Sequence, residues 1–580
     1  MTSPANSQRL WRWLPLLSAL VCVAGIYAVC VLKSGMTYLT NDDMSIQTTL
    51  SGVKSGEPYA FVPFVNVLVT APLAALYAIA PSVQWWFAYS HALVVVGLVL
   101  MHGALLWAAH GRGRLAFVGM LLALLAADAA LVVYPITKMG FTLVPGFVGA
   151  GLAAWIVCRR RAWSVPSTVL GLALYVLAVA HREESGIIVL CYLALALFSS
   201  RKLAQKRVAM REALRGTVVP VCVLVGVALV LVLGNKFVQR QVNGAEYEAY
   251  NDARSALLDY PHDTYDENPQ LYQAVGWDGD LYQLVSDWCL MDECVTTHNL
   301  EYLSQNSRKQ TGFATMGEQW DTLMEHAVAK YCLLAWAVIM VATTVLLLLS
   351  QRPAAAWLNV ANVVGTLLLW GLQLYTGRIL YRTVMVSILP SVAFALGLVL
   401  RVSYDPARRR VAVACVAAAL LAMVPSMARS VSVSFDQERI QSRLDAAQRV
   451  ETINDYAMAH PDLVFIQGSN IEGSTSPRRT YPGERPTNIL KWGGSDYNSA
   501  LHFLRIRRNG LDGLSGEVFS NDRVRFVCGT SLDQMDVQNG QDSLSTFYRW
   551  QRDRYGAVDI VQEDQICPGA YVMRLVFDED

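Results

Sequence analysis

Eleven stretches of apolar residues, each long enough to cross a bilayer as a helix, constrain the fold of this chain most strongly. They cover residues 13–32, 85–109, 114–134, 141–158, 164–180, 185–200, 216–237, 329–349, 355–375, 379–400 and 411–428. With 54% hydrophobic and only 16% charged residues, the chain is too apolar for a soluble protein. We therefore predict a membrane all-α bundle of about eleven transmembrane helices within residues 1–428.

A twelfth apolar stretch, 61–80, is predicted not to cross the membrane. If it does not cross, every basic cluster falls on the cytoplasmic side, as the positive-inside rule requires. These clusters are Arg9 and Arg12 before the first span, Arg112 and Arg114, Arg159–Arg161, Arg201–Arg215, Arg352, Arg401 and Arg408–Arg410. Pro63, Pro72 and Pro81 would interrupt a span, which favours a helix lying in the outer interface. We expect a multi-pass protein of the plasma (cytoplasmic) membrane with a cytoplasmic N-terminus.

This topology places three segments outside the cytoplasm: a first loop at 33–84, a long loop at 238–328 and a C-terminal region at 429–580. In the long loop, acidic residues outnumber basic ones by sixteen to four, as fits an extracytoplasmic address. The long loop holds Cys289 and Cys294, and the C-terminal region holds Cys528 and Cys567. We predict one disulfide in each of these two segments. The other seven cysteines lie in or beside apolar stretches, where they are expected to act as small apolar side chains.

The C-terminal region differs in kind from the bundle. Short apolar runs predict strands at 463–467, 523–528, 558–561 and 571–577. Helices are predicted at 434–458, 496–508 and 542–555. Residues 474–494, rich in Pro, Gly, Arg and Asn, are interpreted as a loop facing the membrane cavity. The region is therefore expected to be a small extracytoplasmic α/β domain.

Several common functional motifs are absent from the sequence. It has no Walker motif, no dinucleotide fingerprint, no Cys/His metal-binding array and no internal repeat. Cytoplasmic ATP hydrolysis and a nucleotide-sugar domain are therefore not supported, and no nucleic-acid partner is expected.

Tryptophans fall into two groups. Trp85 and Trp86, at the start of a span, are expected in the interfacial belt. Four others lie in the outer segments: Trp277, Trp288, Trp320 and Trp492. A place in a domain core is the favoured interpretation of these four, and stacking on sugar faces is the alternative.

Two adjacent carboxylates, Asp42 and Asp43, follow the first apolar stretch by about ten residues. An acidic pair at the outer membrane face is a candidate for chemistry. The alternative is that Asn41-Asp42-Asp43 merely begins a helix, because Asn and Asp are preferred N-cap residues.

The acidic pair belongs to a longer pattern: Tyr38–Asp43, Gly52, Glu57-Pro58, the segment from Asn66 to Pro72, Leu73, Tyr77 and Pro81-Ser82. This pattern resembles the first extracytoplasmic loop of GT-C glycosyltransferases, integral-membrane enzymes that use polyprenyl-phosphate-linked sugars. The layout of the chain is also similar, with juxtamembrane helices, a proline-rich turn and a soluble C-terminal domain. The resemblance implies a GT-C-like fold and places Asp42 and Asp43 in the catalytic site.

Sugar transfer from a lipid phosphate explains the need for a carboxylate here. A base must take the proton of the acceptor hydroxyl as this group attacks the anomeric carbon. Two neighbouring carboxylates repel each other, which can raise the pKa of one and match it to proton transfer. Whether Asp42 or Asp43 is the base stays open.

Cations outside the membrane should hold the leaving phosphate. Arg378 and Arg382, four residues apart, share one helical face at the outer end of a span. The alternative is that both snorkel to lipid headgroups as ordinary end-of-span arginines. Lys138 and Arg182, in two tight outer turns, are further candidates for binding the donor phosphate.

Other ionisable residues are candidates for lining the same cavity. His181, Glu183 and Glu184 share the turn of Arg182, although a self-satisfied Arg/Glu surface pair would explain part of this turn equally well. Asp128 lies inside a span, where an ionisable residue is costly, and is expected to face the bundle interior with Lys138 or an arginine as its partner. A role in helix packing is the alternative. No cofactor is assigned, and a divalent metal remains open.

We expect an enzyme that transfers a sugar from a polyprenyl-phosphate carrier to a cell-envelope glycan, lipid or protein on the extracytoplasmic face. One alternative is a transporter or flippase of lipid-linked saccharides, for which Asp128 would matter more than the acidic pair. A non-catalytic envelope-assembly protein with the same fold is the other alternative. The large outer segments argue against a transporter.

Overall fold

The computed structural model describes residues 4–578, apart from 160–163, 205–209, 310, 469–470, 472–476, 478–484 and 539. Arg160, Arg161 and parts of the segments 201–215 and 474–494 thus lie outside the described residues. Helices match the predicted spans: α1 (Pro4–Ser34), α4 (Trp85–His110), α5 (Arg114–Leu131), α7 (Val144–Cys158), α8 (Val165–His181), α9 (Glu183–Ala204), α10 (Met210–Leu258), α15 (Ala329–Leu348), α16 (Ala356–Tyr375), α17 (Tyr381–Val399) and α18 (Pro406–Ala422). Among the described residues, nine helices are long and apolar enough to cross a membrane, whereas α7 and α8 are shorter. The chain is thus a mostly helical, multi-pass membrane protein.

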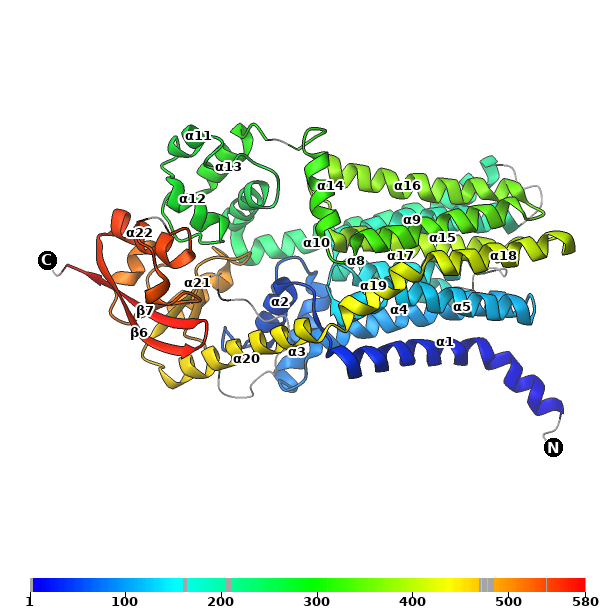
Figure 1. Ribbon diagram of the computed structural model, residues 1–580, viewed down its shortest axis with the longest axis horizontal. Coiled ribbons are helices and arrows are strands. Elements are labelled where there is room, and N and C mark those ends of the chain that lie inside the picture. The colour runs from blue at the N-terminus through cyan, green and yellow to red at the C-terminus, as the bar shows by residue number, and fades with distance from the viewer. Residues whose placement is uncertain are drawn as a thin grey trace.

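The basic loops between these helices gather at one end of the bundle. Hydrogen bonds from arginine side chains to backbone carbonyls join three pairs of loop residues: Arg112 with Val402, Arg401 with Arg159, and Arg352 with Leu203. The N-terminus lies at this end, and the C-terminal sheet lies at the other (Figure 1). Because the basic loops share one end, the sequence-based prediction of their common side agrees with the fold.

Close helix packing explains why the short helix α7 is almost entirely buried. A Cβ atom at Gly97 of α4 would lie 2.5 Å from the carbonyl oxygen of Phe147, and one at Gly151 would lie 2.6 Å from that of Gly97. Glycines at these positions let the two backbones approach directly, as small residues do between membrane helices. Helix α7 therefore sits inside the bundle, between α4 and α17.

The first outer segment forms a layer at the end of the bundle. It contains β1 (Thr37–Tyr38), α2 (Asn41–Ser51) and α3 (Val67–Ile79), which packs on α2, α4 and α8. Helix α3 has 13 residues and so extends only about 20 Å, less than the roughly 30 Å hydrocarbon core of a bilayer. Because α7 and α8 are also shorter than this, length alone does not distinguish α3 from a span, and the non-crossing of residues 61–80 stays a prediction.

The C-terminal region is a mixed sheet with helices on both faces. Its strands are β3 (Val464–Gln467), β4 (Ile489–Lys491), β5 (Val524–Cys528), β6 (Ala557–Cys567) and β7 (Ala570–Phe577), in the order β4-β3-β5-β7-β6. The first three are parallel, and β7 runs antiparallel to both β5 and β6. The helices are α20 (Gln437–Ala459), α21 (Ala500–Arg508) and α22 (Ser543–Tyr555). The predicted strands and helices are therefore present, but β4 lies in the segment predicted to be a loop throughout.

The long outer loop and the C-terminal region share one hydrophobic core. Helices α11 (Pro269–Gln273), α12 (Gly279–Ser286) and α13 (Thr297–Asn306) pack with the outer end of α10 against the sheet. Asp292 accepts a hydrogen bond from the Trp550 indole at 2.8 Å and pairs with Arg554 at 3.0 Å. Trp277 and Trp492 are buried in this core, as predicted, whereas Trp288 and Trp320 are partly exposed. The two segments predicted separately thus form a single domain at the end of the bundle opposite the basic loops (Figure 1).

All eleven cysteines lie in the described residues and all are free thiols, so the two predicted disulfides are wrong. Strand β7 separates β5, which ends at Cys528, from β6, which ends at Cys567. Two strand spacings amount to about 9.5 Å, beyond the roughly 7 Å between Cα atoms that a disulfide can span. In the long loop, Cys289 is buried in the core and Cys294 lies 3.5 Å from Arg554 Nη1. The positions of these cysteines in the sequence therefore did not predict which sulfur atoms lie close together.

Candidate functional site

The acidic pair lies in the first turn of α2 but does not cap it. Thr40 occupies the N-cap position, with no hydrogen bond from its side chain, and Asp42 and Asp43 follow within the helix. The Asp43 side chain turns inward and the Asp42 side chain turns toward α17. The capping alternative therefore does not describe what these carboxylates contact.

Asp43 is fully buried and held by two donors. Its Oδ1 accepts hydrogen bonds from Trp86 Nε1 at 3.3 Å and from the backbone N–H of Phe141 at 3.0 Å. Phe141 comes into reach because β1 pairs in parallel with β2 (Lys138–Met139), and Leu39 donates to the Met139 carbonyl. The short ladder thus fixes the acidic turn against the connection between α6 (Val133–Thr137) and α7.

Burial changes the acidity of this carboxyl group. It raises the pKa of Asp43 to about 8, because a charged carboxylate is poorly solvated there. The N–H of Phe141 acts in the opposite direction, the neighbouring charge of Asp42 raises the pKa again, and Trp86 and Arg382 lower it. Asp43 is therefore largely protonated at neutral pH.

Asp42 is the accessible member of the pair. Its side chain is 36% exposed, and its Oδ2 lies 3.3 Å from Nη1 of Arg382, in the first turn of α17. Arg378 precedes the same helix and pairs with Asp259 at 3.3 Å, with its guanidinium 5.5 Å from the ring centre of Tyr260. The structure thus brings both predicted arginines to one place, and one of them to the acidic pair.

A cavity of about 490 Å³ opens beside these arginines, between the long outer loop and the turn that joins α16 to α17. Its polar wall is formed by Asp259, Tyr260, His262, Thr264, Tyr282, Lys309, Glu318, Gln319, Arg378 and Arg382. This volume is in the range of small-molecule binding sites. The long loop therefore supplies residues that the sequence gave no signal for, notably Asp259 and Tyr260.

Arg182 lies close to the same group of charges. It pairs with Glu184 at 2.9 Å, and its guanidinium stacks over the rings of Phe64 and Phe141 at 5.2 and 5.1 Å. Burial lowers the pKa of Arg182, and the charges of Arg382 and Arg378 lower it further, whereas Glu184 and Asp42 raise it. The Arg182–Glu184 pair predicted as an alternative is thus present, within electrostatic reach of Asp42.

His181 and Glu183 contact residues that position the site. The buried His181 ring stacks on Trp86 at 4.9 Å, and among the described residues neither of its nitrogens has a hydrogen-bond partner. Glu183 accepts from Asn235 at 3.0 Å and from Asn66 at 3.4 Å, which ties the turn to α10 and to the start of α3. Trp86 is fully buried, so its predicted place in the interfacial belt is wrong.

Two predicted site residues lie elsewhere. Asp128 faces the bundle interior, as expected, but its partner is His102 at 2.8 Å and not Lys138 or an arginine. His102, on the adjacent helix α4, pairs with Oδ2 of this buried carboxylate, whereas Oδ1 has no hydrogen-bond partner among the described residues. The sequence spacing did not reveal this pairing. Lys138 lies over the ring of Tyr134 at 5.6 Å, and its charged neighbours are Arg439 and Arg443.

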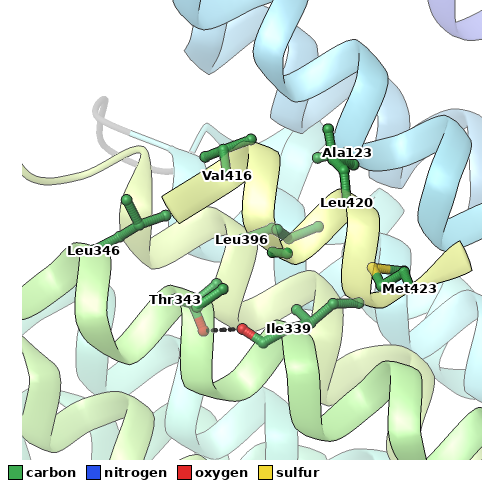
Figure 2. A pocket seen from close by; sticks show the side chains of 10 residues that line it. Ala123, Ile339, Thr343, Leu346, Leu396, Val416, Leu420 and Met423 are labelled. Carbon is green, nitrogen blue, oxygen red and sulfur yellow. Dashed lines mark hydrogen bonds between the residues drawn. The ribbon is translucent and has the colours of Figure 1, made fainter. Parts of the chain in front are cut away.

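A second cavity, of about 60 Å³, lies within the bundle between α5, α15, α17 and α18. Figure 2 shows its apolar side chains, among them Leu346, Leu396 and Met423, and one polar group, the Thr343 hydroxyl. This hydroxyl donates to the Ile339 carbonyl of its own helix at 2.7 Å. The cavity therefore offers no group for chemistry.

Within the described residues, no group of three His, Cys, Asp or Glu side chains is placed to hold a metal ion. Comparison with known proteins does not assign the chain to a family. No protein family, no curated protein and no solved structure matches this chain.

Proposed function

We propose that this protein is a membrane glycosyltransferase that moves a sugar from a polyprenyl-phosphate carrier to a cell-envelope acceptor on the extracytoplasmic face. One observation carries the assignment: an accessible carboxylate, Asp42, lies 3.3 Å from Arg382. Arg382 and Arg378 line a cavity of about 490 Å³. Sugar transfer from a lipid phosphate needs a base and a phosphate-binding group side by side.

Each residue has a distinct role in this reaction. Arg378 and Arg382 bind the donor phosphate, which displaces the carboxylates that now pair with them. Arg382 then leaves Asp42 free to accept a proton. Asp43, which is fully buried, contacts no substrate and acts as a positioning residue that holds the turn through Trp86 and Phe141.

The bonds change as follows. The acceptor hydroxyl attacks the anomeric carbon while Asp42 takes its proton, and the bond from this carbon to the phosphate oxygen breaks. Polyprenyl phosphate leaves with the electron pair, and the two arginines hold its additional negative charge. Aromatic and polar groups of the long loop, such as Tyr260, His262 and Gln319, are in reach of a sugar in the cavity.

Transfer is tested by incubating the purified protein with radiolabelled polyprenyl-phosphate sugars and acceptor glycans, and measuring release of polyprenyl phosphate. A glycosyltransferase cleaves the donor in the presence of an acceptor, and Asp42→Asn does so more slowly by about a hundredfold or more. A transporter or flippase in vesicles moves intact donor across the bilayer and releases none. Movement without cleavage by the parent protein would refute the assignment.

A further inference from the structure

Three cations meet at a place separate from the Arg378 and Arg382 cavity. Arg439 and Arg443 lie one turn apart on α20, so their side chains share a face. Arg443 donates to the hydroxyl of Thr37, and Thr37 pairs with Lys138 in the short β1–β2 ladder, which brings Lys138 beside the two arginines. Burial, together with the charges of Arg443 and Arg439, lowers the pKa of Lys138 to about 8. Burial, together with the charge of Lys138, lowers the pKa of His326 to about 4.

Within the described residues, Lys138 and Arg443 form no ion pair, and Arg439 pairs with one carboxylate. In the part of the chain that the structure describes, no carboxylate lies within ion-pairing distance of Lys138. Arg443 donates to the Thr37 hydroxyl at 2.9 Å and to the Arg439 carbonyl at 3.0 Å, both neutral acceptors. Asp436 is the nearby carboxylate; it lies 3.4 Å from Arg439 and accepts from the first N–H groups of α20. The group therefore carries a net positive charge that folding alone does not explain.

The location of the group is the outer surface of the bundle. Helix α19 (Val424–Ser434) packs on α5 and on α6 (Val133–Thr137), and α20 begins directly after it. Lys138 follows α6, and its ammonium lies over the Tyr134 ring. Tyr134 in turn packs edge-on against Tyr381 and His326, which give the site a rigid aromatic base. Arg439 is half exposed, so the group is open to a ligand from outside.

We propose that Lys138, Arg439 and Arg443 form a second anion site that binds a phosphate group at the outer membrane surface. A phosphate offers several acceptor oxygens, which suit one ammonium and two guanidinium groups approaching from β2 and α20. The phosphate comes either from a lipid headgroup or from a free phosphate. This site is independent of the proposed sugar transfer, because Arg378 and Arg382 belong to the other cavity.

The test measures the apparent unfolding temperature of the purified protein in phosphatidylcholine nanodiscs. Inorganic phosphate is titrated in one arm, and nanodiscs containing phosphatidylglycerol are compared in the other. We expect stabilisation of the parent, with an apparent phosphate affinity at least about tenfold weaker in Lys138→Gln and Arg443→Gln. Stabilisation by phosphatidylglycerol alone assigns the site to a lipid headgroup, and stabilisation by both assigns it to any phosphate.

Three further variants keep the result interpretable. Arg439→Gln changes a half-exposed side chain and should fold even if Lys138→Gln does not. Arg507→Gln removes an exposed arginine of α21 and should behave like the parent. Arg382→Gln should also retain the stabilisation, because it alters the other cavity. Absence of stabilisation in both arms, or equal loss in Arg507→Gln, would overturn the second site.

Discussion

Asp42 and Arg382 are 340 positions apart in the sequence, yet Oδ2 of Asp42 lies 3.3 Å from Nη1 of Arg382. The contact joins the first outer helix to the start of α17, a deeply buried helix of the bundle. Next to it, Asp43 is sealed from solvent by Trp86 and Phe141. Two adjacent carboxylates thus occupy opposite environments, and different environments give them different roles.

Replacing Asp42 by Asn should lower turnover by about a hundredfold or more, because the variant keeps the size of the side chain but cannot accept the proton. Donor affinity should change little. Rates and donor binding are measured separately, with Glu57→Gln as the control because Glu57 is an exposed carboxylate of the same outer segment. Parental turnover in Asp42→Asn would remove this residue from the role of base.

Arg378→Gln and Arg382→Gln should each weaken donor binding by about 1.5 to 3 kcal/mol, the contribution expected for a charge-assisted hydrogen bond to phosphate. Binding is measured with a labelled polyprenyl-phosphate sugar. Arg240→Gln serves as the control, since Arg240 is an exposed arginine of the long outer loop. Unchanged donor affinity in both variants would support the snorkelling alternative.

Asp43 should make the stability of the protein depend on pH. Burial raises its pKa from 3.8 to about 8. Between about pH 4 and 8, the folded state therefore keeps a proton that the unfolded state has already lost. Stability contributed by this group is therefore present below about pH 4, falls as the pH rises to about 8 and is constant above it. Asp43→Asn, which stays neutral, should become progressively more stable than the parent across this window. Parallel unfolding temperatures from pH 5 to 8 would contradict the buried, protonated state.

Topology can be tested with single cysteines in a background that lacks the native ones. Ile79→Cys, at the 80% exposed end of α3, should react with a membrane-impermeant maleimide added outside intact cells. Gly111→Cys, in the turn between α4 and α5, should react only after the membrane is opened. The reverse pattern would place the acidic pair in the cytoplasm and exclude an extracytoplasmic site.

The position of the candidate site followed from local patterns only in part. Asp42, Asp43, Arg378 and Arg382 were all found by their chemistry and by their places at the outer ends of spans. Lys138 has the same chemistry and a similar position, yet its charged neighbours are Arg439 and Arg443, because Arg443 of α20 donates to Thr37, the residue paired with Lys138. Asp259 could not be predicted as a site residue, because it is one of many acidic residues in the long loop. Only the folded chain places it beside Arg378.

The helical bundle, the common end of its basic loops and the main elements of the C-terminal sheet could be predicted from the sequence. The length of each apolar stretch, the positions of the arginines and the alternation of apolar residues in strands are local properties of the sequence. They can be recognised without knowing which segments pack together. Three features became visible only in the folded chain: the burial of Asp43, the pairing of Asp128 with His102, and the position of β7 between Cys528 and Cys567. These outcomes depend on which surfaces pack together, because burial, pairing and sulfur distance are properties of residues far apart in the chain.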